Sequence, residues 1–163
     1  MNPPLAGSAP DIRPLTEDEL PMVTALYCAV FNAPPWNDAW TPETAASRLR
    51  DAARTPGALG MVVWQDGQLV ACLLGYREQW HDGIHFYLKE LFVEAARQRR
   101  GIGMQLLQEL TRRLHGDQVS RIYLLTERGG DAADFYLAQG YYQSPRMTMM
   151  VTRLEDAQDR PGR

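Results

Sequence analysis

One stretch, residues 90–103, constrains the fold of this chain more than any other. It begins with ELFV, which is typical of a β-strand, continues through a loop with three arginines, and ends at Gly101 and Gly103, where helical spacing begins. Amide groups in the first turn of a helix have no partner within it, and the helix dipole places partial positive charge there. A strand that leads directly into such a helix predicts a cradle for an anion such as a pyrophosphate.

The remaining apolar and turn pattern predicts an α/β chain. Strands are expected over roughly 12–15, 59–65, 68–79, 84–93 and 121–126, with one or two closing strands over 141–153, and helices over roughly 16–30, 41–54, 101–115 and 132–139. Asp66-Gly67 is a hairpin turn signal, and Thr16 with Glu19 has the spacing of a helix capping box. The predicted order of elements is β-α-α-β-β-β-α-β-α-β, which indicates a mixed central sheet flanked by helices.

Length and composition favour one globular domain. The chain has 163 residues, of which 45% are hydrophobic and 23% charged, so a single domain is expected over 12–153, between a flexible leader, 1–11, and a flexible tail, 154–163. The net charge of -3 gives no basic surface for nucleic acid. Because no apolar run is long enough for a bilayer and the start lacks a signal-peptide pattern, we expect a cytoplasmic protein without a membrane partner.

Three classes of phosphate-binding motif compete for the stretch at 90–103. A P-loop needs Gly-Lys-Ser/Thr at its end, and a dinucleotide-binding fingerprint needs a third glycine with an acidic residue about twenty positions on. Residues 98–103, QRRGIG, instead resemble the Gln/Arg-x-x-Gly-x-Gly/Ala signature of the GNAT acetyltransferase superfamily. Residues 135–141, FYLAQGY, resemble the same family's Phe-Tyr-x-x-x-Gly-Phe/Tyr motif. The resemblance spans roughly residues 12–153, since the order of elements also matches.

The resemblance implies a GNAT fold, acetyl-CoA as acyl donor and an amine as acceptor. It implies that backbone amides over 98–104 hold the CoA pyrophosphate, that the preceding strand pairs with the pantetheine arm and polarises the thioester carbonyl, and that Tyr136 protonates the departing thiolate. The positions that it assigns to the cofactor are Leu91, Phe92, Val93, Gln98, Arg99, Arg100, Gly101, Ile102, Gly103 and Met104. Many members have proline at the position of Ala95 and asparagine at that of Gly129, so a side-chain contact to pantetheine stays open.

Glu90 is the first candidate for the base that takes a proton from the acceptor. An alkylammonium has a pKa near 10, about that of lysine, so a base is required. In strict alternation Glu90 shares one face of its strand with three apolar residues, Phe86, Leu88 and Phe92. Burial there would raise its pKa into a useful range. The alternatives are an ion pair with Lys89 or an arginine, or a β-bulge that turns it to solvent. Glu78 is the second candidate, acting through water.

Tyr136, the candidate acid, has a packing alternative beside Phe135. Neither Cys28 nor Cys72 has metal-ligand spacing or an adjacent histidine base in the sequence, and a buried thiol accounts for each. We therefore expect direct attack of the amine in a ternary complex, with no metal and no covalent intermediate on the protein.

The candidate acceptor residues are Trp36, Asp38, Trp40, Glu78 and His85. The first three lie on a proline-broken loop, where aromatic rings can form the wall of an amine or sugar site or a clasp on the sheet. The carboxylates, with a looser similarity to aminoglycoside N-acetyltransferases, favour a small cationic acceptor such as an aminoglycoside. A peptide or protein N-acetyltransferase and a non-catalytic acyl-CoA-binding regulatory module are the alternatives. A homodimer through the last strands, which carry Met147, Met149, Met150 and Val151, stays open because these side chains could equally be core.

Overall fold

The computed structural model describes residues 8–154, in two compact units that meet in the chain between Leu125 and Thr126. The expected leader, 1–11, and tail, 154–163, lie mostly outside the described residues. The first unit contains a five-stranded sheet in chain order, β1 (Asp11–Pro14), β2 (Ala58–Gln65), β3 (Gln68–Trp80), β4 (Gly83–Val93) and β5 (Val119–Tyr123). Neighbouring strands are antiparallel except for the parallel pair β4–β5, so the predicted mixed sheet is confirmed.

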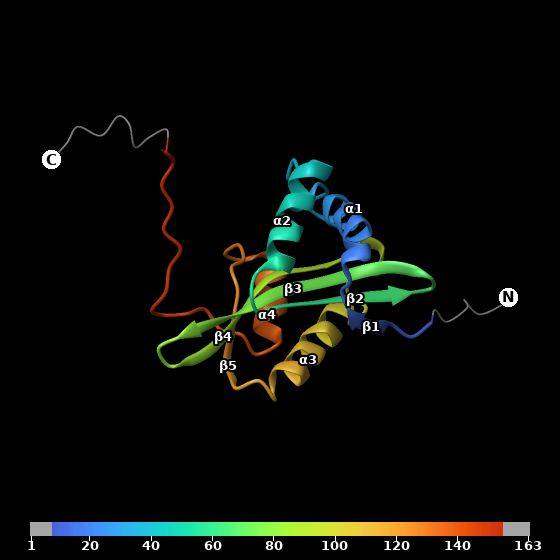
Figure 1. The fold of residues 1–163 in the computed structure, drawn as a ribbon. Coiled ribbons are helices and arrows are strands. Elements are labelled where there is room, and N and C mark those ends of the chain that lie inside the picture. The colour runs from blue at the N-terminus through green and yellow to red at the C-terminus, as the bar shows by residue number, and fades with distance from the viewer. Residues whose placement is uncertain (1–7, 155–163) are drawn as a thin grey trace. The chain divides into compact units, whose positions relative to one another are not determined.

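Helices cover both faces of this sheet (Figure 1). On one face lie α1 (Leu20–Phe31), preceded by a 3-10 turn, η1 (Glu17–Glu19), and α2 (Pro42–Arg54). The N-cap of α2 is Thr41, whose hydroxyl accepts a hydrogen bond from the Thr44 amide at 3.2 Å. Proline stands in the first turn of α2, as predicted. On the other face lies α3 (Ile102–Leu114), which buries one stripe of five apolar residues, Ile102, Leu106, Leu107, Leu110 and Leu114.

A bulge in the β3–β4 pair overturns the strict alternation predicted around Glu90. Leu74 pairs with Glu90, whereas the next residue, Gly75, pairs with Leu88, so one residue of β4 has no opposite number. Because residues opposite each other in a ladder point to the same face, the extra residue shifts the phase of the strand by one. The prediction that Phe86 and Leu88 share a face with Glu90 is therefore wrong, although all three side chains are buried.

The second unit contains α4 (Gly130–Ala138), close to the predicted helix. The closing strand expected over 141–153 is not formed among the described residues, where these positions carry no strand assignment. A strand is stabilised by ladder hydrogen bonds and by a buried face. Here the apolar side chains have no such face, since four of them are between 65% and 86% exposed, Met147, Met149, Met150 and Val151.

Glu19 is a buried carboxylate with four hydrogen-bond donors around it. It accepts hydrogen bonds from the Thr16 amide and hydroxyl, both at 2.9 Å, and from Arg13 Nη2 and Trp64 Nε1, both at 3.0 Å. The reach of Glu19 back to Thr16 is the part of the predicted capping box that these bonds confirm. Burial acts to raise the pKa of Glu19, but the hydrogen bonds from Thr16, Trp64 and Arg13 outweigh it and hold the pKa below its usual value.

We expect Glu19→Ala to lower the free energy of unfolding by about 2 to 3 kcal/mol, because it leaves the Trp64 N–H and the Thr16 amide without an acceptor. Since the folded-state pKa is the lower one, the carboxylate stabilises the fold above its unfolded-state pKa, and this contribution is lost as pH falls through the folded value. Urea unfolding at neutral and acidic pH measures both effects. Glu17→Ala, which removes an exposed carboxylate paired with Arg54, is the matched control, and an equal loss there would contradict the assignment.

Candidate functional site

The loop for which an anion cradle is predicted leads from β4 into α3. After β4 comes a 3-10 turn, η2 (Ala95–Arg97), and Gly101 at the N-cap of α3 has a φ of +84°, which glycine adopts readily. The first hydrogen bond along the helix is donated by the Gln105 amide to the Gly101 carbonyl at 3.0 Å. The amides of Ile102, Gly103 and Met104 therefore have no helical acceptor. No acidic side chain lies in this fully described first turn.

The edge of β4 next to the cradle is partly open. The parallel pairing of β4 with β5 ends at Tyr87 and Tyr123, whereas β4 continues to Val93. Residues 88–93 therefore present backbone groups that pair with no strand on that side within residues 8–154. An extended ligand could add to this edge as a short strand does.

The residues predicted to bind the cofactor are brought together at this end of β4, in three environments. Leu91 and Val93 are half-buried on the strand, and the Gln98 side chain donates to the Val93 carbonyl at 3.0 Å, which braces the loop. Phe92 is buried and packs edge-on against Tyr27 at 5.2 Å, so only its backbone faces the open edge. The remaining positions form the loop and the first turn of α3, where Ile102 is buried and the other residues are at least partly exposed, Arg99, Arg100, Gly101, Gly103 and Met104.

Glu90 lies buried on the face of the sheet that α1 and α2 cover, and is only 6% exposed. Arg48 of α2 donates from Nε to Glu90 Oε1 at 2.5 Å, and its guanidinium lies 5.5 Å from the centre of the Trp40 ring. Burial raises the pKa of Glu90 above its usual value, although the Arg48 charge acts to lower it. Of the alternatives considered for Glu90, the ion pair with an arginine is the one found, and the carboxylate is buried against α2 rather than turned to solvent.

The loop between α1 and α2 is held by aromatic packing and by its own hydrogen bonds. Trp36 packs against Phe31 at 5.6 Å, and Trp40 against Tyr27 at 5.3 Å between ring centres. Trp40 Nε1 donates to Asp38 Oδ2 at 3.0 Å. Both tryptophans are half-buried and Asp38 is exposed, so the loop combines a hydrophobic clasp with a carboxylate that faces solvent.

Glu78 lies in a cluster of aromatic rings further along the face that carries Glu90. The Tyr123 hydroxyl donates to Glu78 Oε2, and Trp80 Nε1 donates to the same oxygen at 3.4 Å. The Tyr87 and Tyr123 rings stack at 4.9 Å. Glu78 is an even number of residues from Leu74 along β3, so it lies on the face of Leu74 and of its partner Glu90, and the register places it opposite His85.

His85 belongs to the same cluster and is buried. Its ring stacks on Trp80 at 4.8 Å, and its Nε2 lies 3.0 Å from Asp82 Oδ1 without the geometry of a hydrogen bond. Asp82 also lies 3.4 Å from Arg121 Nη2. The face of the sheet that holds Glu90 therefore also carries Glu78 beside aromatic rings, and Asp82 lies in the turn between β3 and β4.

Tyr136 lies in α4, in the second unit. Its ring packs against Phe135 at 5.2 Å and against Tyr141 at 5.4 Å, and burial raises the pKa of Tyr141 to about 12. The tyrosine is half-buried, and its role as an acid stays a prediction.

Sequence reasoning missed several residues around Glu90 and Glu78. Arg48 gives no signal of its own, because a lone arginine on an amphipathic helix is usually solvated. The strand residues near Glu78 did give a usable signal. Tyr76, Glu78 and Trp80 alternate at the period of a strand and must therefore share a face.

No group of three or more His, Cys, Asp and Glu side chains within residues 8–154 is placed to hold a metal ion. In the same part of the chain, no helix has the length and apolar character that crossing a membrane requires.

Comparison with known proteins places this geometry in a family. The model of the acetyltransferase (GNAT) family matches residues 20–141, whereas no sequence among the curated proteins matches. A transcriptional regulator from Bacillus halodurans C-125 superposes with a TM-score of 0.72 at 17% identity, over 88% of this chain and all of that one (100%). An aminoglycoside N-acetyltransferase in complex with CoA gives 0.72 at 14% identity, over 93% and 99%. An aminoglycoside acetyltransferase from an uncultured soil metagenomic sample, in complex with sisomicin, gives 0.69 at 19% identity, over 89% and 96%.

Proposed function

The chain belongs to the acetyltransferase (GNAT) family, and from that premise we propose that this N-acetyltransferase modifies a primary amine of a small cationic acceptor, such as an aminoglycoside. The observation that carries the proposal is the shared sheet face, on which Glu90 lies with Glu78 and an aromatic cluster. Carboxylates attract a polycation, and ring faces bind ammonium groups by cation–π contacts. Two structural neighbours are aminoglycoside acetyltransferases, which agrees with this acceptor class.

The donor site in this proposal follows the open edge of β4 and the start of α3. Acetyl-CoA would place its pyrophosphate on the amides around Gly101 and Gly103, where the helix dipole favours an anion. Its pantetheine arm would pair with backbone groups of Leu91 and Val93 along the unpaired edge. Arg99 and Arg100, both exposed, add positive charge beside the phosphates.

The proposed reaction is direct attack within a ternary complex. The acceptor ammonium first gives a proton to Glu90, or to Glu78 through water, and the free amine then forms a bond with the thioester carbon. A backbone amide at Phe92 stabilises the oxyanion of the tetrahedral intermediate. The carbon–sulfur bond then breaks, and Tyr136 donates a proton to the CoA thiolate. The raised pKa of Glu90 suits a base, because a carboxylate of ordinary pKa holds a proton too weakly to accept one from an ammonium group.

Arg48 should tune this base. We expect Arg48→Gln to raise the pKa of Glu90 further, because it removes the cation that opposes the effect of burial. A base must be deprotonated to act, so the acidic limb of the kcat/KM profile should move to higher pH, with lower activity at acidic pH and recovery at alkaline pH. The pH–rate profile measures this shift.

Arg54→Gln is the matched control for Arg48→Gln. It removes the same charge from the same helix, but its partner, Glu17, is exposed. Its acidic limb should lie where that of the unmodified protein does. Identical profiles for all three proteins would show that Glu90 is not the group whose titration controls the rate.

The acceptor is identified by free thiol release from acetyl-CoA in the presence of aminoglycosides, polyamines, amino acids and basic peptides. We expect turnover with aminoglycosides or polyamines. Turnover with basic peptides alone would move the protein to the peptide acetyltransferases. CoA binding measured separately, with no turnover on any amine, would instead support a regulatory CoA-binding role.

A further inference from the structure

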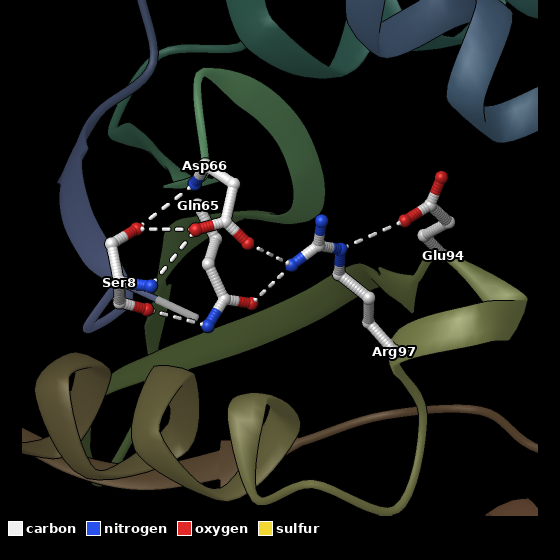
Figure 2. A network of polar contacts seen from close by, with 5 residues as sticks. All are labelled: Ser8, Gln65, Asp66, Glu94 and Arg97. Carbon is white, nitrogen blue, oxygen red and sulfur yellow. Dashed lines mark hydrogen bonds and ion pairs between the residues drawn. The ribbon is translucent and has the colours of Figure 1, made fainter. Parts of the chain in front are cut away.

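A network of polar contacts fastens the loop before α3 to the β2–β3 turn (Figure 2). Arg97 is its centre, with Nη1 donating to Gln65 Oε1 at 2.7 Å and to Asp66 Oδ2 at 3.1 Å. Its Nε donates to Glu94 Oε2 at 3.2 Å. One guanidinium therefore joins the end of β4 to a hairpin turn about thirty positions earlier in the chain.

Ser8 extends the network to a third segment. Its amide and hydroxyl donate to Asp66 Oδ1 at 2.8 and 2.9 Å, and the Asp66 amide donates to the Ser8 hydroxyl at 3.0 Å. Gln65 Nε2 donates to the Ser8 carbonyl at 2.7 Å. Ser8 thus orients both side chains that accept hydrogen bonds from Arg97. Gln65 and Asp66 each use one polar atom of the side chain to bond Ser8 and another to bond Arg97 (Figure 2).

Arg97 differs from the two arginines that follow it. Its side chain is only 17% exposed, whereas Arg99 and Arg100 are exposed, and its guanidinium is paired with the carboxylates of Glu94 and Asp66. In Figure 2 its guanidinium faces the turn that carries Asp66. The positive charge of Arg97 therefore pairs with carboxylates of the protein itself rather than with a ligand.

The loop beyond Arg97 needs an anchor of this kind. Arg99 has a φ of +60° and Gly101 a φ of +84°, so the backbone from Gln98 to the helix start is not a regular structure with its own hydrogen-bond ladder. A residue other than glycine keeps a left-handed conformation only where its surroundings hold it there. Two side chains brace the start of this loop, those of Arg97 and Gln98, beside the backbone hydrogen bonds of the 3-10 turn.

We propose that Arg97, held by Asp66 and Ser8, is a positioning residue that keeps the loop in the shape that binds the cofactor pyrophosphate. Arg97 does not touch the ligand. This inference rests on the proposed use of the loop as the cofactor cradle. A preorganised loop binds its ligand more tightly, because less conformational freedom is lost on binding.

The test is calorimetric binding of CoA, with KM and kcat for acetyl-CoA measured beside it. Arg97→Ala should raise both the Kd for CoA and the KM for acetyl-CoA by about tenfold, with kcat within about twofold, since no reacting group is touched. Arg97→Lys, which keeps the charge and can bond one carboxylate, should recover part of the affinity. Ser8→Ala should weaken binding in the same direction by a smaller factor. Arg112→Ala removes an exposed arginine of α3 paired with Glu109, and should leave the Kd unchanged.

Asp66→Asn separates positioning from simple charge. If the network acted only through its electrostatic field, removing a negative charge would tighten the binding of an anion. Positioning predicts the opposite, because the amide weakens the hold on Arg97 and on Ser8. Tighter or equal binding by Asp66→Asn, or equal binding by Arg97→Ala, would overturn the inference. Failure of the unmodified protein to bind CoA would overturn the proposed cradle instead, and the two results are therefore distinguishable.

Discussion

Gly103→Glu is expected to weaken CoA binding by roughly a hundredfold or more, since an unfavourable contact of several kcal/mol corresponds to this factor. Gly103 lies in the first turn of α3, where the amides have no helical acceptor. A glutamate there would place a side chain and a negative charge where a pyrophosphate is proposed to sit. Calorimetric titration with CoA measures the loss.

The fold should tolerate this substitution. Gly103 is not among the positions of positive φ, and glutamate is a better helix former than glycine by somewhat under 1 kcal/mol. A carboxylate near a helix N-terminus is also favourable. Thermal unfolding of Gly103→Glu should therefore match or exceed that of the unmodified protein, so that lost binding cannot be attributed to lost structure.

Gln108→Glu is the matched control, because it adds the same charge at an exposed position of the same helix, away from its start. It should change the Kd for CoA by less than about threefold, as expected of a screened surface charge. Unchanged affinity in Gly103→Glu would overturn the assignment of the cofactor site.

Tyr136→Phe should lower kcat by about a hundredfold, the lower end of the usual contribution of a general acid, while the Kd for acetyl-CoA stays within about twofold. Phenylalanine retains the ring that packs against Phe135 and Tyr141 while the hydroxyl, the proposed proton donor, is removed. Steady-state turnover and calorimetric binding, measured on the same preparation, separate the two quantities.

Tyr141→Phe controls for the loss of a neighbouring hydroxyl. The two rings lie 5.4 Å apart, and the family motif accepts phenylalanine at the position of Tyr141. Its kcat should stay near that of the unmodified protein. If Tyr136→Phe turns over as fast as the unmodified protein, Tyr136 is not the acid.

The order of elements up to α4 could be predicted from the sequence because local signals were unambiguous. Asp66-Gly67 forms the predicted turn, with Asp66 at a φ of +53° and Gly67 at +76°, and Thr41-Pro42 begins a helix as expected. The closing strand at 141–153 was predicted from its apolar residues, which indicate a need for burial but not what will supply it. In the described structure these residues stay exposed instead.

The environment of Glu90 could be predicted only in part. The burial of Glu90 could be predicted from the pattern of the strand. Which residues share its face could not, because one extra residue in β4 moves Phe86 and Leu88 to the opposite face. A signal was present in Gly75, since a glycine within a strand often marks a bulge or a close approach. A Cβ at this position would lie 2.3 Å from the Tyr87 carbonyl oxygen, so no other residue fits without a shift.

The Arg48 ion pair could not be predicted, because it joins residues 42 positions apart whose meeting depends on how α2 packs on the sheet. Local periodicity shows which side of a helix faces the core, but not which strand residue lies opposite it. The same limit applies to Ser8, whose partners in the β2–β3 turn lie 57 and 58 positions away.

The most direct measurement of the account is the fate of the acetyl group. The protein is mixed with isotopically labelled acetyl-CoA and an acceptor from the panel, and the reaction is quenched during the first turnovers. The masses of the protein and of the acceptor are then measured by mass spectrometry. We predict labelled acetyl on an amine of the acceptor, one free CoA thiol for each acetyl transferred, and no labelled protein. An acetylated protein that forms before the product and then decays, or thiol release without an acetylated acceptor, would contradict direct transfer.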